Sequence, residues 1–139
     1  MNPLVISTLP HYLAIYPVVS VYKTYTSDYI HIILASSTLS IVYHVYEESN
    51  PLLTFLDYLV AFVWLAYDVK LSMDTKQWKQ ILFLNGLICT LNLSVTYTKN
   101  YLLFHSLWHL VSAAKCFYVS TLIKQIVDKR EFSRRRPPV

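Results

Sequence analysis

Five long apolar runs divide this chain, and each approaches the length that a helix needs to cross a lipid bilayer. They cover residues 3–22, 29–46, 52–69, 79–97 and 101–123, with charged or turn-forming residues between them. A membrane-spanning helix requires about 20 mainly apolar residues. The connections between the runs are short, which favours helices that pass up and down side by side. We therefore predict an all-α fold, an integral membrane helical bundle of about five transmembrane helices.

The proportion of charged residues supports a membrane protein over a soluble one. Only 14% of the 139 residues are charged and 55% are hydrophobic, whereas soluble domains carry roughly 25% charged residues. The charges that remain are concentrated near the end of the chain, so the sequence divides into one transmembrane domain, residues 1–123, and a basic tail, residues 124–139. Such a tail is typical of a cytoplasmic stop that follows a span, more than of a nucleic-acid or anionic-lipid patch. No nucleic-acid partner is expected.

The distribution of lysine and arginine predicts how the chain is oriented. The basic tail and the connection that carries Lys70, Lys76 and Lys79 are expected in the cytoplasm, because positive charge accumulates there. The connection at residues 47–51 reads EESNP and contains no lysine or arginine. We predict that the N-terminus lies outside or in a lumen and that the C-terminus is cytoplasmic, in a multi-pass protein of the endoplasmic reticulum, the Golgi or the plasma membrane.

Several polar residues occur in runs that are otherwise apolar. The second run contains Ser40 and His44, the third begins with Asp57 close to its start, and the fifth contains His105 and His109 four residues apart. With the orientation above, all five come to similar depths in the outer half of the bundle. Ionisable residues within spans are costly and usually serve a function.

The chemistry of these residues suits a metal site. Two histidines at positions i and i+4 share one helical face, and a third from another helix gives the three protein ligands of an open, catalytic zinc site. His44, His105 and His109 are therefore predicted zinc ligands. Asp57 is a candidate to orient a water molecule or accept its proton, and Ser40 to hydrogen-bond that water or a carbonyl oxygen. Each histidine taken alone would more often be an interfacial or helix-bridging residue.

The remaining polar residues within the runs indicate contacts between helices. Lys115 lies deep in the fifth run, where its side chain either reaches toward the cytoplasm or pairs with Asp68 of the third run. Asn85 and Asn92 share one face of the fourth run and are expected to join helices. No partner can be assigned to His11 from the sequence.

The pattern S-x-x-x-H, then D, then H-x-x-x-H resembles that of the CREST superfamily across residues 36 to 118. This superfamily joins alkaline ceramidases, adiponectin-receptor-like proteins, GPI-remodelling phospholipases and myomaker-like proteins. The resemblance implies a zinc ion on His44, His105 and His109, with Ser40 and Asp57 beside it. Members have seven helices, whereas this chain has five runs, so it resembles a shortened form. It also lacks the acidic segment near the N-terminus that alkaline ceramidases use for calcium.

Together, these features favour a zinc-dependent intramembrane lipid hydrolase. Its substrate would be a lipid amide or ester, ceramide-like or a glycerophospholipid, in the outer or lumenal leaflet. The alternative is a non-enzymatic membrane protein, receptor-like, fusion-promoting or an accessory subunit, in which zinc only braces the helices. Intact Ser40 and Asp57 favour the enzyme, because bracing requires only the histidines. The two missing helices favour the alternative, and they suggest a homo-oligomer or a partner membrane subunit.

Overall fold

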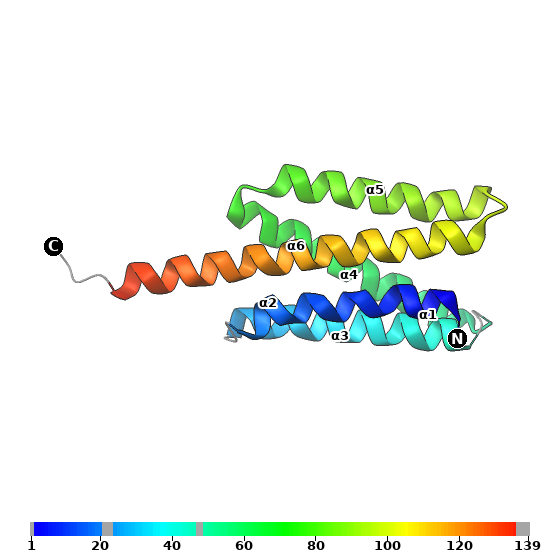
Figure 1. Cartoon of the computed structure of the whole chain (residues 1–139), viewed down its shortest axis with the longest axis horizontal. Coiled ribbons are helices and arrows are strands. Elements are labelled where there is room, and N and C mark those ends of the chain that lie inside the picture. Colours follow the sequence, from blue (N-terminus) through cyan, green and yellow to red (C-terminus); the bar gives the residue numbers. More distant parts are fainter. Residues whose placement is uncertain (1, 21–23, 47–48, 136–139) are drawn as a thin grey trace.

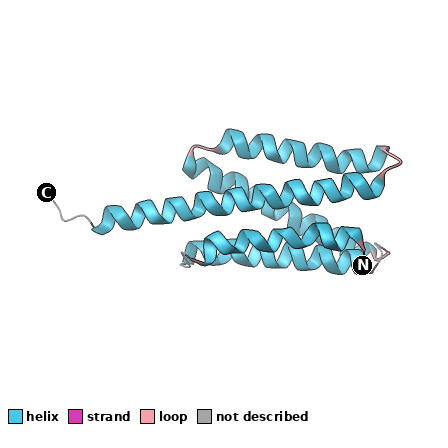
Figure 2. Ribbon diagram, in the orientation of Figure 1, coloured by secondary structure: helices cyan, strands magenta, loops and turns pink. Residues whose placement is uncertain are grey.

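The computed structural model describes residues 2–20, 24–46 and 49–135, and it confirms the all-α prediction: these residues form helices and turns without a strand (Figure 2). The elements in chain order are α1 (Pro3–Thr8), the 3-10 helix η1 (Leu9–Ala14), α2 (Ile15–Val19), α3 (Thr24–Val45), α4 (Pro51–Thr75), α5 (Trp78–Tyr97) and α6 (Tyr101–Arg135). Since α1, η1 and α2 follow one another as a single rod, the described residues form five rods, one for each predicted run (Figure 1).

Three of these rods are long and apolar enough to cross a membrane. They are the segments Pro51–Met73 of α4, Trp78–Tyr97 of α5 and Tyr101–Lys129 of α6, while Pro3–Val19 forms a shorter apolar helix. These lengths are compatible with a multi-pass membrane protein. Spanning by the first two runs stays a prediction, as do the orientation and the membrane in which the chain resides.

Asparagine and proline together start two of the helices. The Asn50 side chain accepts hydrogen bonds from the backbone N–H groups of Leu52 and Leu53, at 2.9 and 3.3 Å, and Pro51 occupies the first turn of α4. Asn2 caps α1 in the same way, ahead of Pro3. This pairing is favourable because an asparagine side chain satisfies exposed N–H groups, and proline has none to satisfy.

The fifth rod is longer than the predicted span. The fifth run ends at residue 123, but α6 continues to Arg135, so residues 124–135 of the basic tail are helical and extend beyond the bundle (Figure 1). The physical reason lies in the composition of this stretch. Between Tyr101 and Pro137 the sequence contains neither glycine nor proline, and lysine, arginine, glutamine and glutamate are good helix formers.

The connections bring the ends of several helices together. The start of α1, the end of α3, the start of α4, the end of α5 and the start of α6 gather at one end of the bundle (Figure 1). Helix α6 packs against the first rod, α4 and α5 and meets α3 through the side chains of His44 and His109, and α3 packs against α1, η1, α2 and α4. The predicted polar residues therefore lie on helices that meet at this end.

Candidate metal centre and its cavity

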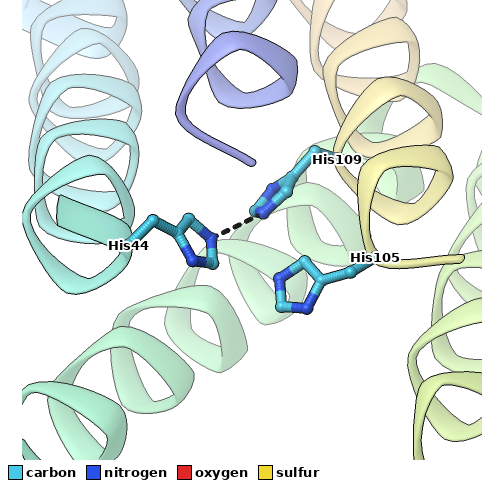
Figure 3. A group of neighbouring side chains, drawn as sticks. All are labelled: His44, His105 and His109. Atoms are coloured by element: carbon cyan, nitrogen blue, oxygen red, sulfur yellow. Dashed lines mark hydrogen bonds between the residues drawn. The ribbon is translucent and has the colours of Figure 1, made fainter. Parts of the chain in front are cut away.

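Three histidines converge between the end of α3 and the beginning of α6. His44 lies one residue before the end of α3, and His105 and His109 lie in the first turns of α6, on one face (Figure 3). One ring nitrogen from each comes within 4.8 Å of the other two. The Nε2 atoms of His44 and His109 lie 2.9 Å apart, in hydrogen-bond contact. The predicted proximity of the three histidines is confirmed.

This arrangement could bind a metal ion. All three side chains are buried, and the cluster contains three imidazoles and no carboxylate or thiolate. In a hydrogen bond between two neutral imidazoles, one Nε2 must donate its proton and the other must accept. A cation that displaced this proton could use both lone pairs, and three imidazole nitrogens leave one position of a tetrahedral ion open. The donor set therefore fits a borderline metal such as zinc better than calcium, which prefers oxygen.

A cavity of about 110 Å³ adjoins the histidines. Three of the five predicted site residues, Ser40, Asp57 and His109, line it, while His44 and His105 are outside its lining. The wall also includes apolar and aromatic side chains of α4 and α5, together with hydroxyl groups of α3. The cavity therefore combines an apolar wall with a few polar groups, which is the composition of most ligand sites, and its volume suits a small group such as an acyl linkage.

The two candidate catalytic residues are buried in this wall. Asp57 is 4% exposed and Ser40 6% exposed. The hydroxyl oxygen of Ser40 has no hydrogen-bond partner among the described residues, and neither has that of Ser37, one turn earlier on α3, which also faces the cavity. Buried hydroxyl groups are almost always hydrogen-bonded in folded proteins. Both serines therefore bring unsatisfied polar atoms to the wall of the cavity.

The structure adds two residues to the predicted site. His11 of η1 lines the cavity, and its ring contacts that of His109 with a centroid distance of 6.1 Å. The side-chain amide of Asn2 donates a hydrogen bond to the backbone carbonyl of His44 at 3.0 Å, which ties the start of α1 to the end of α3. The distance from the start of the helix could have identified His11. It lies eight residues after Pro3, and His109 likewise lies eight residues after Tyr101, so both come to a similar depth below the same end of the bundle. No sequence signal identifies the Asn2 contact.

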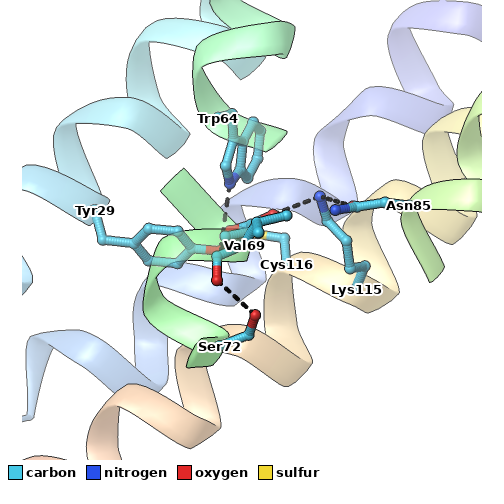
Figure 4. Close-up of polar contacts among 8 residues, drawn as sticks. Tyr29, Trp64, Val69, Ser72, Asn85, Lys115 and Cys116 are labelled. Atoms are coloured by element: carbon cyan, nitrogen blue, oxygen red, sulfur yellow. Dashed lines mark hydrogen bonds and ion pairs between the residues drawn. The ribbon is translucent and has the colours of Figure 1, made fainter. Parts of the chain in front are cut away.

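A second buried polar cluster lies farther along the bundle (Figure 4). Lys115 of α6 forms an ion pair with Asp68 of α4 and donates a hydrogen bond to the Asn85 side chain of α5 at 3.1 Å. Tyr29 of α3 donates to the other carboxylate oxygen of Asp68 at 2.9 Å and accepts from the Trp64 indole at 3.3 Å. The predicted pairing of Lys115 with Asp68 is confirmed, and Asn85 joins helices as expected.

Comparison with known proteins adds no assignment. No family model, curated protein or solved structure matches the chain. The functional conclusion therefore depends on the residues and the geometry described above.

Proposed function

We propose that this chain is a zinc-dependent membrane hydrolase of the CREST type, which cleaves an amide or ester bond of a lipid. One observation carries the proposal: three histidine nitrogens lie within 4.8 Å of one another, and one of these histidines lines a cavity that also contains the Asp57 and Ser40 side chains. The resemblance over residues 36 to 118 involves the same five residues. The lipid would enter from the outer or lumenal leaflet, with the C-terminus in the cytoplasm.

The side chains divide the reaction between them. Bound zinc would act as a Lewis acid and activate water at neutral pH. Asp57 would accept a proton from the attacking water and return it to the leaving nitrogen or oxygen as its bond to the carbonyl carbon breaks. The Ser40 hydroxyl would donate a hydrogen bond to the carbonyl oxygen as that oxygen gains negative charge. The apolar wall would hold the acyl chain and exclude bulk water.

A second candidate function is supported by the position of the triad between helices. His44 and His109 connect α3 with α6 through their side chains, and Asn2 connects α1 with α3. A metal ion at this point would hold the ends of these helices together even without a reaction. In that case the chain would be a receptor-like, fusion-promoting or accessory membrane protein, and Asp57 would not be needed for its function.

Metal content tests the ligands. Purified wild-type protein is expected to contain one zinc ion per chain by elemental analysis, and replacement of His44, His105 or His109 by alanine should lower zinc affinity by more than about 100-fold. His31→Ala is the matched control, because His31 lies exposed on the same helix as His44. Stoichiometric zinc in a variant that lacks all three histidines would refute the assignment.

Lipid cleavage then separates the two functions. Asp57→Asn should retain zinc but release fatty acid about 10²–10⁴ times more slowly, because it removes a positioned acid–base group. The assay uses zinc-loaded protein with ceramides and with glycerophospholipids, and measures released fatty acid by mass spectrometry. If wild-type protein releases no more fatty acid than the Asp57→Asn variant from either lipid class, the metal only braces the helices.

A further inference from the structure

His11 is a buried cavity residue in contact with His109, and the proposed reaction gives it no role. Its side chain is 4% exposed, and its ring lies edge-on against Trp64, with a centroid distance of 5.6 Å, and against His109 at 6.1 Å. Both of these neighbours also line the cavity. The packing fixes the position of the ring from two sides.

A backbone hydrogen bond fixes which ring nitrogen of His11 carries the proton. The Nδ1 atom lies 2.8 Å from the carbonyl oxygen of Thr8. Since a carbonyl can only accept, Nδ1 must be the donor. In the neutral imidazole Nε2 then carries a lone pair. Within the part of the chain that the structure describes, no hydrogen bond reaches this Nε2.

Packing and the bond to Thr8 explain the position of the His11 ring and the role of Nδ1, but they give no role to Nε2. A histidine kept for its local bond and its contact with Trp64 would use Nδ1 alone. Nε2 is not one of the enclosed polar atoms that lack a hydrogen-bond partner, so its lone pair keeps accessible surface where His11 lines the cavity. Lys115 is a donor on the same cavity wall, but its ammonium group already bonds Asp68 and Asn85. A ligand in the cavity that brings its own donor could therefore pair with Nε2.

We infer that His11 is a ligand-binding residue that selects substrates with an N–H or O–H group beside the reacting carbonyl. Its Nε2 accepts that hydrogen bond, so the cavity prefers a lipid amide to the ester of the same shape. This inference rests on the proposed function, since it places an acyl linkage in the cavity. It adds to that proposal a preference for the amide over the ester, and it assigns this preference to His11.

The test compares two probes of equal shape, a long-chain secondary amide and the ester of the same two alkyl chains. We expect wild-type zinc-loaded protein in detergent to bind the amide about tenfold more tightly, the ratio that one buried hydrogen bond gives. Binding is measured by thermophoresis on ice, and mass spectrometry verifies that the probes are intact. Each affinity ratio comes from one protein sample, so it does not depend on how much of a variant is folded.

Two substitutions at position 11 separate ligand binding from packing. His11→Gln places an amide oxygen near the position of Nε2 and loses the bond to Thr8, so it should retain the tenfold preference. His11→Asn places its amide N–H near the position of Nδ1 and leaves the Nε2 position empty, so it should bind both probes equally. A purely structural His11 would give the opposite pattern, with the preference retained in His11→Asn.

Three results would overturn the inference: equal binding of both probes by the wild type, no binding of either probe, or an undiminished preference in His11→Asn. Cleavage is not measured in this experiment. A chain that releases no fatty acid, yet prefers the amide through His11, would therefore refute the hydrolase and leave the role of His11 intact.

Discussion

Two clusters of polar side chains are buried in the part of this bundle that the structure describes, and they differ in the chemistry of their polar groups. In the cluster around Lys115, the ammonium group contacts a carboxylate and an amide oxygen, and Asp68 contacts both the ammonium and the Tyr29 hydroxyl. In the histidine cluster, three ring nitrogens converge on one another and one of the rings faces a cavity. In the first cluster the two charges are paired with each other, although the Asn85 amide nitrogen has no hydrogen-bond partner among the described residues. The second adjoins a cavity and could bind a metal ion.

The comparison shows that burial of a polar residue in a membrane bundle does not by itself indicate a binding site. Lys115 and Asp68 are both almost fully buried, yet their contacts join α3, α4, α5 and α6 and account for them without a ligand. The three histidines, unlike Lys115 and Asp68, do not form an ion pair with one another. Their imidazole nitrogens are ligands that transition metals prefer. We therefore expect changes in the Lys115 cluster to alter stability, and changes in the histidine cluster to alter ligand binding.

The largest loss of stability should follow removal of one partner of the ion pair. Asp68→Ala leaves the Lys115 ammonium buried without its carboxylate, and such changes typically lower the free energy of unfolding by about 3–5 kcal/mol. Unfolding in mixed micelles of increasing SDS content, followed by circular dichroism, measures this change.

The matched control removes both charges. A double variant with Asp68→Asn and Lys115→Met should recover most of the stability, because a pair of neutral side chains avoids the cost of an uncompensated charge. If Asp68→Ala and the double variant were equally stable, the ion pair would not be what holds these helices. The distinction between the two clusters would then fail.

A smaller loss is expected at Tyr29. Tyr29→Phe removes the hydroxyl that donates to Asp68 and accepts from Trp64 but keeps the ring, so we expect a decrease of about 1 kcal/mol in the free energy of unfolding. Tyr67→Phe is the control, because the Tyr67 ring stacks on that of Tyr29 with a centroid distance of 5.9 Å and the structure gives its hydroxyl no hydrogen bond among the described residues. Equal effects of the two substitutions would show that ring packing, rather than the hydrogen bond, sets the stability.

Sequence reasoning predicted the parts of the molecule that depend on local composition and on counting along helices. The five rods follow from five apolar runs, and the meeting of His44 with His105 and His109 follows from their equal depth once the runs are taken as antiparallel helices. For Lys115 the sequence left two alternatives, a side chain that reaches toward the cytoplasm or a pair with Asp68. The structure shows the pair with Asp68, whose carboxylate is the opposite charge buried beside it. The sequence prediction set the end of the fifth span near residue 123 and did not address how far the helix continues, because hydropathy marks where a span ends, whereas helix propensity decides where a helix ends.

What the sequence could not provide depends on rotation about helix axes and on contacts between distant segments. The orientation of each helix decides which of its polar faces meet, and this is why Tyr29 and Trp64 joined the ion pair without any signal in the sequence. The Asn2 contact joins residues 42 positions apart. His11 belongs to a 3-10 segment around Pro10, whose turn sets the direction of the ring, and no periodic pattern predicts that turn.

The smallest effect on stability should come from the serines of the cavity wall. Ser37 and Ser40 are both buried, both face the cavity, and neither hydroxyl has a hydrogen-bond partner among the described residues. Replacement by alanine therefore removes no bond and relieves a buried polar atom, so each variant should unfold within about 0.5 kcal/mol of the wild type. The same SDS titration measures this, and a loss as large as that of Tyr29→Phe would mean that the hydroxyls hold the bundle together.

With stability unchanged, the lipid assay distinguishes the two positions: Ser40→Ala should slow fatty-acid release because Ser40 lies one turn from His44, whereas Ser37→Ala, one turn farther away, should not.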